Sequence, residues 1–255
     1  MTTVNAARCK PASVWLRVGR FEVKRQIRAH DRVARVAGMM FRDRAEAGQK
    51  LAAALLPHKV EQPILYALPR GGVAVAAEVA NALDAPLELL LVRKIGVPWQ
   101  PELAMGAVVD GSAPIIFKNS DVLAMTGVSQ EEFDAVCRRE LDEIERRRAI
   151  YLGAREWLDP KDVTAIVIDD GIATGATMTA ALRAMRQHHP AKLILAVPVA
   201  AQDTIARLGG EADSIVCLDT PANLRAIGYY YRDFAQLTDD DVRKILSTCR
   251  RSKGR

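Results

Sequence analysis

The sequence has no hydrophobic run long enough to cross a membrane. Its longest run, LILAVPVAA at residues 193–201, is about half of the roughly 18 residues that a membrane span needs, and it contains a proline. The N-terminus shows no basic segment, apolar segment and small-residue cleavage site in series, so no secretory signal is evident. We therefore expect a cytoplasmic protein with no membrane partner.

Cysteine is scarce, and two nucleotide-binding fingerprints are absent. The four cysteines lie far apart without a CxxC pair, which argues against a zinc site or a disulfide framework and fits a reducing cytosol. Neither GxxxxGKS nor GxxxxGKT occurs, so no P-loop is expected. The lack of GxGxxG disfavours a dinucleotide-binding fold.

The net charge of +5 is carried by one part of the chain. Residues 1–39 hold nine Lys and Arg against two acidic residues, so this basic extension carries +7 and the rest of the chain −2. A mildly acidic body argues against a nucleic-acid partner. Three interpretations of the extension compete: a tail for an acidic partner, an Arg-rich targeting peptide, or upstream sequence translated from a misplaced start. We favour the last, because regular structure is expected to begin directly after Met40.

Residues 40–255 are expected to form one domain in which strands and helices alternate. Helical spacing of apolar residues follows Phe41, and a Ser129–Glu132 capping box opens a long charged helix at 129–151. Shorter helices are expected at 73–83, from Thr177 and near 203–208. Buried-type strands are expected at 64–68, 87–95, 163–168, 193–197 and 214–218, with two short strands in LAMGAVVDG and PIIF. This alternation implies a Rossmann-like α/β fold: a parallel sheet flanked by helices, with its ligand site beyond the carboxyl ends of the strands.

The most informative stretch is AIVIDDGIATGAT at residues 165–177. A buried strand ends at Asp169 and Asp170, small residues follow, and an amphipathic helix begins at Thr177. Small residues let backbone N–H groups approach a ligand, and a helix N-terminus favours a phosphate. The two carboxylates would repel that phosphate, but they suit vicinal hydroxyls or a hydrated Mg²⁺. A phosphate and a diol about one sugar ring apart indicate a ribose 5-phosphate.

This stretch resembles the phosphoribosyl pyrophosphate (PRPP) motif of type I phosphoribosyltransferases. The resemblance implies that Asp169 and Asp170 hold the ribose hydroxyls, and that Mg²⁺ meets them indirectly, through PRPP. It implies a 5-phosphate loop made of Ala173, Thr174, Gly175, Ala176 and Thr177. Over about residues 40–240 the chain is similar to a bacterial group of stand-alone phosphoribosyltransferases that share FRDRAEAG, RKIGVP and PELAMGAV.

Two further strand-end loops resemble parts of the same family's site. LPRGG matches the pyrophosphate loop, through Arg70, Gly71 and Gly72, and an unusual peptide geometry is expected at Arg70–Gly71. Arg93 and Lys94 resemble an Arg-Lys pair that lies beside pyrophosphate and before a mobile lid. Residues 96–102 would be that lid, but they lack the lysine that related enzymes carry there. The residues expected to carry catalysis are Arg70, Lys94, Asp169 and Asp170.

The acceptor is less well defined. Ala173 lies where the 6-oxopurine enzymes have an aspartate and the adenine enzymes an alanine, which leans towards adenine. A small hood over the base is expected from residues 41–56 and 219–240. Ile172, Tyr229 and Tyr231 are the candidate base contacts, although hood core or interface explains the tyrosines equally well.

The resemblance implies a Mg²⁺-dependent enzyme of nucleotide salvage. It would transfer the 5-phosphoribosyl group of PRPP to a nucleobase, release pyrophosphate and act as a homodimer. The alternative is a PRPP-binding regulator of the same fold that performs no transfer. Retention of Arg70, Arg93 and Lys94 favours the enzyme, whereas the missing lid lysine favours the regulator.

The Asp170→Asn variant tests the assignment of the acidic pair. It should weaken PRPP use by roughly 1.5–3 kcal/mol, the scale of a hydrogen bond to a charged group. Steady-state rates at varied PRPP concentration measure the effect, and unchanged PRPP kinetics would count heavily against the assignment.

Overall fold

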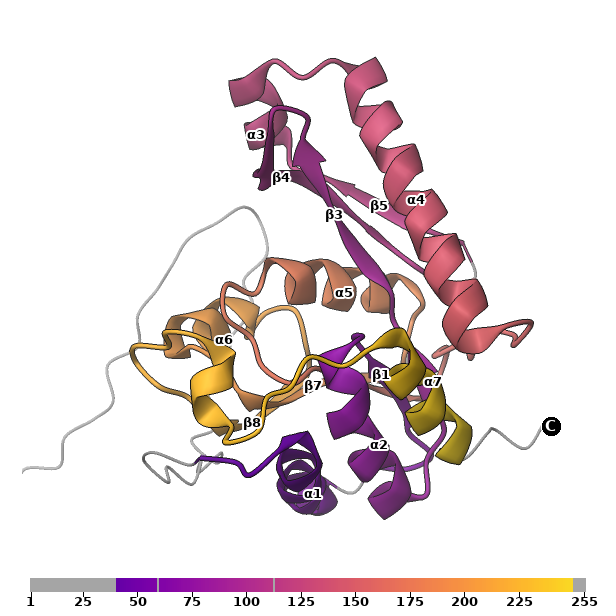
Figure 1. Cartoon of the computed structure of the whole chain (residues 1–255), viewed down its shortest axis with the longest axis vertical. Helices are drawn as coiled ribbons and strands as arrows, with labels where there is room; N and C mark the ends of the chain where they lie inside the picture. The colour runs from indigo at the N-terminus through magenta and orange to yellow at the C-terminus, as the bar shows by residue number, and fades with distance from the viewer. Residues whose placement is uncertain (1–39, 59, 112, 250–255) are drawn as a thin grey trace, which may run out of the picture. The chain divides into compact units, whose positions relative to one another are not determined.

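A computed structural model describes residues 40–58, 60–111 and 113–249 of the protein, so the expectations for residues 1–39 lie outside the described residues. Five parallel strands form a sheet in the order β2-β1-β6-β7-β8 (Figure 1). Their bounds are β1 Ile64–Ala67, β2 Leu87–Leu89, β6 Thr164–Ile168, β7 Lys192–Val199 and β8 Ser214–Asp219. With helices on both faces, this sheet confirms the predicted α/β class.

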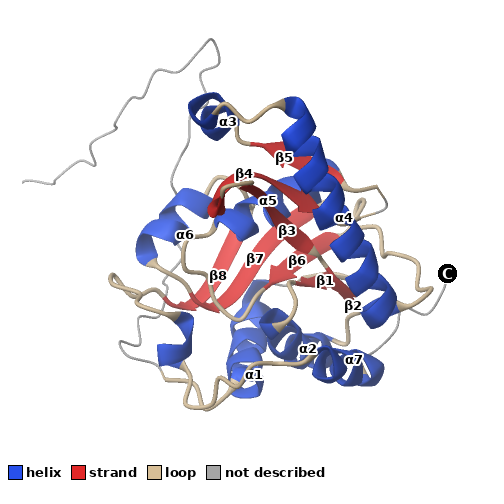
Figure 2. Cartoon of the chain, turned by 45° about the horizontal axis from the view of Figure 1, so that its top comes forward, coloured by secondary structure: helices blue, strands red, loops and turns tan. Residues whose placement is uncertain are grey.

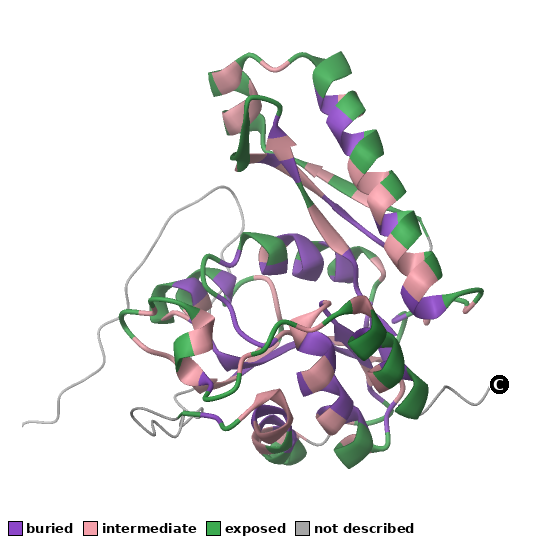
Figure 3. Ribbon diagram, in the orientation of Figure 1, coloured by how far each residue is buried: buried purple, intermediate pink, exposed green. Residues whose placement is uncertain are grey.

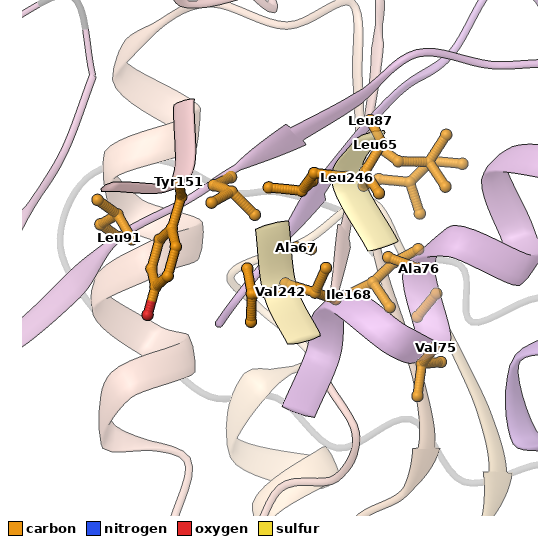
Figure 4. Close-up of a cluster of buried hydrophobic side chains, with 14 of the residues drawn as sticks. Leu65, Ala67, Val75, Ala76, Leu87, Leu91, Tyr151, Ile168, Val242 and Leu246 are labelled. Atoms are coloured by element: carbon orange, nitrogen blue, oxygen red, sulfur yellow. The ribbon is translucent and has the colours of Figure 1, made fainter. Parts of the chain in front are cut away.

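The strand side chains alternate between two cores, one on each face of the sheet. Leu65 and Ala67 point into a cluster shared with α1 (Arg44–Leu55), α2 (Gly71–Leu83) and α7 (Asp239–Thr248). Figure 4 shows part of that cluster, with Val242 and Leu246 of α7 beside Leu65 and Ala67. Tyr66 belongs to the opposite cluster, which α5 (Ala176–Gln187) and α6 (Gln202–Leu208) help to form. Burial on both faces explains why these strands read as continuous apolar runs (Figures 2 and 3).

A second, antiparallel sheet follows β2 in the chain. It consists of β3 (Val92–Val97), β4 (Gln100–Val109) and β5 (Ile115–Lys118), and α4 (Gln130–Leu152) packs against β3. The prediction of one strand at 87–95 was therefore wrong: Leu90 and Leu91 separate two strands of different sheets. Both leucines are buried, so the apolar run continues across the break and hides it from a reading of periodicity.

The segment predicted as a mobile lid is a hairpin tip. Residues 96–102 include the ends of β3 and β4, and only Pro98 and Trp99 lie between the two strands. Trp99 is 61% exposed at this tip.

The long charged helix was predicted correctly, together with its cap. Ser129 Oγ accepts the Glu132 N–H at 3.2 Å, and Glu132 Oε2 accepts the Ser129 N–H at 2.9 Å. Two helices were not predicted, α3 (Ser120–Thr126) and α7. The α7 helix does carry a signal, because Thr238 and Asp241 form a second capping box. None of the helices in the described part of the chain combines the length and hydropathy that crossing a bilayer requires.

Residues 41–56 were predicted to contribute to a hood over the base, and that role stays a prediction. Most of them belong to α1, which packs on α2, β7 and β8 as part of the helical layer, and a short 3-10 helix, η1 (Leu56–His58), follows. The C-terminal segment predicted to share the hood contains another 3-10 helix, η2 (Ile227–Tyr230). Phe41 joins the two segments, because its N–H donates to the Tyr230 carbonyl at 2.7 Å.

Close packing of α1 on α2 yields a test of this arrangement. A Cβ on Gly48 would lie 2.5 Å from the Val75 carbonyl oxygen and 2.7 Å from Glu78 Cβ. We expect Gly48→Ala to destabilise the protein by about 1–3 kcal/mol, although alanine is the better helix former, because the helices would have to separate. Urea unfolding measures the change. Ala53→Ser, at an exposed position of the same helix, is the matched control, and equal stability of both variants would contradict the packing.

Candidate functional site

The strand order locates a crevice between β1 and β6. Counted along the chain, the parallel strands run 2-1-3-4-5, so the connections leave β1 and β6 in opposite directions across the sheet. In such sheets, ligands bind beyond the carboxyl ends of the strands at this switch point. LPRGG follows β1 and DDGIATGAT follows β6, so two of the three predicted loops meet there.

The two loops are in contact, and the glycine pair makes this possible. A Cβ on Gly71 would lie 1.9 Å from Asp170 Oδ2, and one on Gly72 would lie 2.9 Å from Asp169 Cα. Only glycine permits so close an approach of the α2 backbone to the acidic pair. An unusual peptide is present, but it is the cis bond Pro69–Arg70, one residue before the predicted position.

Asp169 and Asp170 have different environments. The Asp170 N–H donates to Asp169 Oδ1 at 2.8 Å. Burial, and then the neighbouring charge of Asp170, raise the pKa of Asp169 well above its usual range. Arg44, at the start of α1, donates from Nε to Asp170 Oδ2 at 2.8 Å, and both side chains are nearly buried. Among the described residues, Asp170 therefore forms an ion pair and Asp169 forms none.

Arg44 was missed by the sequence reasoning. Its guanidinium lies 3.9 Å from the Phe234 ring centroid and donates to the Ala235 carbonyl at 2.9 Å, as well as pairing with Asp170. It therefore links α1, the acidic pair and the C-terminal segment. In the sequence, Arg44 was marked only by its place in FRDRAEAG, a motif that the chain shares with the bacterial group and to which no role was assigned.

Four of the five residues of the predicted phosphate loop are exposed. Ala173, Thr174, Ala176 and Thr177 are exposed, and Gly175 adopts φ +79°, a conformation that favours glycine, just before α5. Within the described part of the chain, no N–H of residues 173–177 donates to a protein acceptor. These donors and the N-terminus of α5 make an arrangement suited to an anion.

The α6 helix supports this loop on its carbonyl side. Thr204, itself buried, donates from Oγ1 to the Ala173 carbonyl at 2.7 Å. Arg207 donates to the Thr174 carbonyl at 3.1 Å. The α6 helix therefore holds the loop through its carbonyls, and the loop's N–H groups have no acceptor among the described residues.

The predicted pyrophosphate cations each face a carboxylate. Arg70 Nη1 lies 3.8 Å from Asp239, Arg93 donates to Glu140 at 2.7 Å, and Lys94 to Glu102 at 3.0 Å. Arg93 lines a small cavity of about 80 Å³ together with Pro69, Asp169 and Thr177. Residues from all three predicted loops therefore surround one space, whereas Lys94 lines a neighbouring, larger cleft.

Two of the three candidate base contacts are buried in the protein. Ile172 is 4% exposed and lies in the apolar cluster beneath α5. Tyr231 is 5% exposed, stacks on Phe234 and donates its hydroxyl to the Asp170 carbonyl at 2.6 Å. Both side chains therefore support the site from within, and contact of either residue with a base stays a prediction. Tyr229 is 68% exposed and can still contact a ligand.

Comparison with known proteins agrees with this geometry. The family model described as phosphoribosyl transferase domain matches residues 42–232. Two Mycobacterium tuberculosis proteins are each 43% identical to this chain over 212 residues, or 83% of its length: MT0597 (strain CDC 1551) and Rv0571c (strain H37Rv). Their names give phosphoribosyl transferase as a provisional assignment. The match covers 47% of each, so the chain spans about half the length of these curated relatives. The crystal structure of TT1426 from Thermus thermophilus is similar with a TM-score of 0.69 and 40% identity, covering 82% of this chain and 98% of that one.

The unequal environments of the two carboxylates predict opposite effects on stability. A raised pKa means that the folded state binds the Asp169 proton more tightly, so ionising this group costs stability once the pH exceeds its ordinary pKa of about 4. Asp169→Asn should therefore raise the melting temperature at about pH 8, and the gain should shrink towards about pH 4.

The control is Asp170→Asn, which leaves the nearly buried Arg44 without its counter-charge. It should lower stability by about 1–3 kcal/mol at neutral pH. Calorimetric melts across pH compare the two variants, and a loss of stability in Asp169→Asn at every pH would contradict the unequal roles.

Proposed function

Because the chain belongs to the phosphoribosyl transferase family, we propose that it transfers the 5-phosphoribosyl group of PRPP to a nitrogenous base and releases pyrophosphate. The observation that carries this proposal is the meeting of the two glycine-containing loops across β1 and β6. One loop begins at a pair of carboxylates, against which the other loop packs, and it offers N–H groups that have no acceptor in the part of the chain that the structure describes. An anion and a diol of one sugar phosphate match this set of groups.

The 5-phosphate of PRPP would lie on the N–H groups of residues 173–177, with added donors from Thr174 and Thr177. The ribose hydroxyls would donate to Asp169 and to the second carboxylate oxygen of Asp170, beside the one that pairs with Arg44. A diol that donates to Asp169 offsets the burial and the like charge that raise the pKa of this carboxyl in the free protein.

The pyrophosphate would be bound by Arg70, Arg93 and Lys94. Each now pairs with a carboxylate at a partly or fully exposed position, and such pairs contribute little to stability. Pyrophosphate, with several charged oxygens, can replace these partners. Positioning of C1 and compensation of the leaving group's charge would then carry the reaction, through an oxocarbenium-like transition state.

Mg²⁺ fits this site only if the substrate supplies most of its ligands. In the described part of the chain, no three His, Cys, Asp or Glu side chains are grouped to hold a metal ion. Mg²⁺ is commonly bound by one or two carboxylates together with phosphate oxygens and water, and Asp169 and Asp170 offer those carboxylates. When bound, the ion would neutralise charge on the leaving pyrophosphate.

The acceptor is proposed to be a nucleobase-like molecule, as in nucleotide salvage. Tyr229 remains the candidate for stacking on it, and Ala173 leans towards adenine. A cytoplasmic homodimer is proposed on the family resemblance.

A PRPP-binding regulator is the second candidate, and one observation favours it. Arg93 forms an ion pair with Glu140, and Lys94 forms one with Glu102. The hairpin tip at Pro98 and Trp99 contains no lysine that would add positive charge. A protein that only senses PRPP needs the phosphate loop and the acidic pair, but no compensation of a leaving group.

Pyrophosphate release separates the two functions. The protein is incubated with PRPP and Mg²⁺, with pooled purine and pyrimidine bases or with no base, while PRPP binding is measured separately by calorimetry. We expect release that depends on the base, and dividing the pool then identifies the acceptor. Binding of PRPP without any release would favour the regulator, and no binding would refute both.

A further inference from the structure

We propose that Arg44 is a positioning residue for the sugar: it fixes Asp170 in the orientation that selects a ribose diol, and residues 231–235, the anchor segment, fix Arg44. This inference rests on the proposed function, in which Asp170 accepts a ribose hydroxyl. Arg44 lies outside the motif AIVIDDGIATGAT and is 126 positions away from Asp170 in the chain.

Arg44 occupies an unfavourable place in its own helix. It is the first residue of α1, directly after the N-cap Asp43, whose side chain accepts the Glu46 N–H at 2.8 Å. The N-terminus of a helix carries a partial positive charge, so it favours acidic residues and disfavours a cation. Residues that break a local rule of this kind are expected at functional sites. The reason for an arginine here therefore lies in contacts outside the helix.

The guanidinium of Arg44 contacts different groups with different parts. Its Nε donates to Asp170 Oδ2 at 2.8 Å, its Nη1 donates to the Ala235 carbonyl at 2.9 Å, and its Cζ lies 3.9 Å from the centroid of the Phe234 ring. The side chains of Arg44 and Asp170 are only 11% and 13% exposed. A lysine would keep the charge, but its ammonium group lacks the planar set of donors that makes these contacts together. The contacts therefore fix the orientation of the guanidinium as well as its charge.

Main-chain hydrogen bonds join the anchor segment to the residues just before α1. The Arg232 N–H donates to the Phe41 carbonyl at 2.8 Å, and the Asp233 N–H donates to the Arg42 carbonyl at 2.9 Å. Arg44 follows two residues after this paired stretch of backbone. The anchor segment therefore determines where α1 begins and where the Arg44 side chain starts.

The anchor segment also holds the main chain of Asp170. Tyr231, which is 5% exposed, donates its hydroxyl to the Asp170 carbonyl at 2.6 Å. Tyr231 stacks on Phe234 with the ring centroids 4.9 Å apart, so the residues that contact Asp170 and Arg44 support each other. A carboxylate held in this way presents its oxygens in a fixed direction, as preorganised recognition of a hydroxyl requires.

Two sugar phosphates that differ only in their hydroxyls test the proposal. Ribose 5-phosphate and 2,3-dideoxyribose 5-phosphate share the phosphate, so the ratio of their dissociation constants measures recognition of the diol. Calorimetric titration of the full wild-type chain should give a preference for ribose 5-phosphate of at least about tenfold. Arg44→Lys should lower this preference to less than about threefold although the charge is retained. Phe234→Leu should lower it at least about threefold relative to the wild type, because the ring no longer holds the guanidinium.

Arg42→Lys is the matched control. Arg42 belongs to the same motif, FRDRAEAG, and pairs with Asp43, but its side chain is 67% exposed. Within the described part of the chain, its side chain forms no hydrogen bond with the acidic pair. The preference for ribose 5-phosphate should therefore change less than about twofold.

The ratio separates positioning of Asp170 from general support of the fold. If Arg44→Lys and Phe234→Leu keep the wild-type ratio, or weaken both sugar phosphates equally, the proposal is wrong. Titration of the wild-type protein with PRPP keeps the two proposals apart. If PRPP binds while the ratio does not respond to the variants, only the positioning role fails. If PRPP does not bind, the proposed function fails, and the positioning role fails with it.

Discussion

The site depends on two adjacent carboxylates held together at the end of β6. The negative charges of the two neighbouring carboxylates repel each other, and burial adds to the cost of ionising Asp169. The fold limits that cost by pairing Asp170 with Arg44 and by directing the Asp170 N–H at Asp169. Under the proposed function, hydroxyl groups of the ligand would donate to both carboxylates and offset the cost of ionising them. A pair of carboxylates that is costly to ionise is typical of a functional site.

Under the proposed function, the remaining features place an anion next to these carboxylates. The N–H groups of residues 173–177 have no acceptor among the described residues, and α6 binds the carbonyls of Ala173 and Thr174 through Thr204 and Arg207. LPRGG approaches the acidic pair only because Gly71 and Gly72 have no side chains. Donors for a phosphate and acceptors for a diol are thereby kept apart on neighbouring strands, and neither group cancels the other.

Local patterns predicted the parallel sheet, the capped α4 helix and the loops of the site, because each depends on a few consecutive residues. What failed depended on contacts between distant segments. The division of residues 87–95 between two sheets lies inside a continuous apolar run, and the partner of Asp170 is Arg44, far away in the chain. Ile172 and Tyr231 look like ligand contacts in the sequence, but tertiary packing buries both.

A crystal structure of the protein with PRPP and Mg²⁺ would test the central claim, that the two loops at β1 and β6 form one PRPP site. We expect the 5-phosphate on the N–H groups of residues 173–177, the ribose hydroxyls on Asp169 and Asp170, and the pyrophosphate near Arg70 and Arg93. A PRPP molecule whose 5-phosphate lies away from this loop, or whose ribose does not contact the acidic pair, would contradict it.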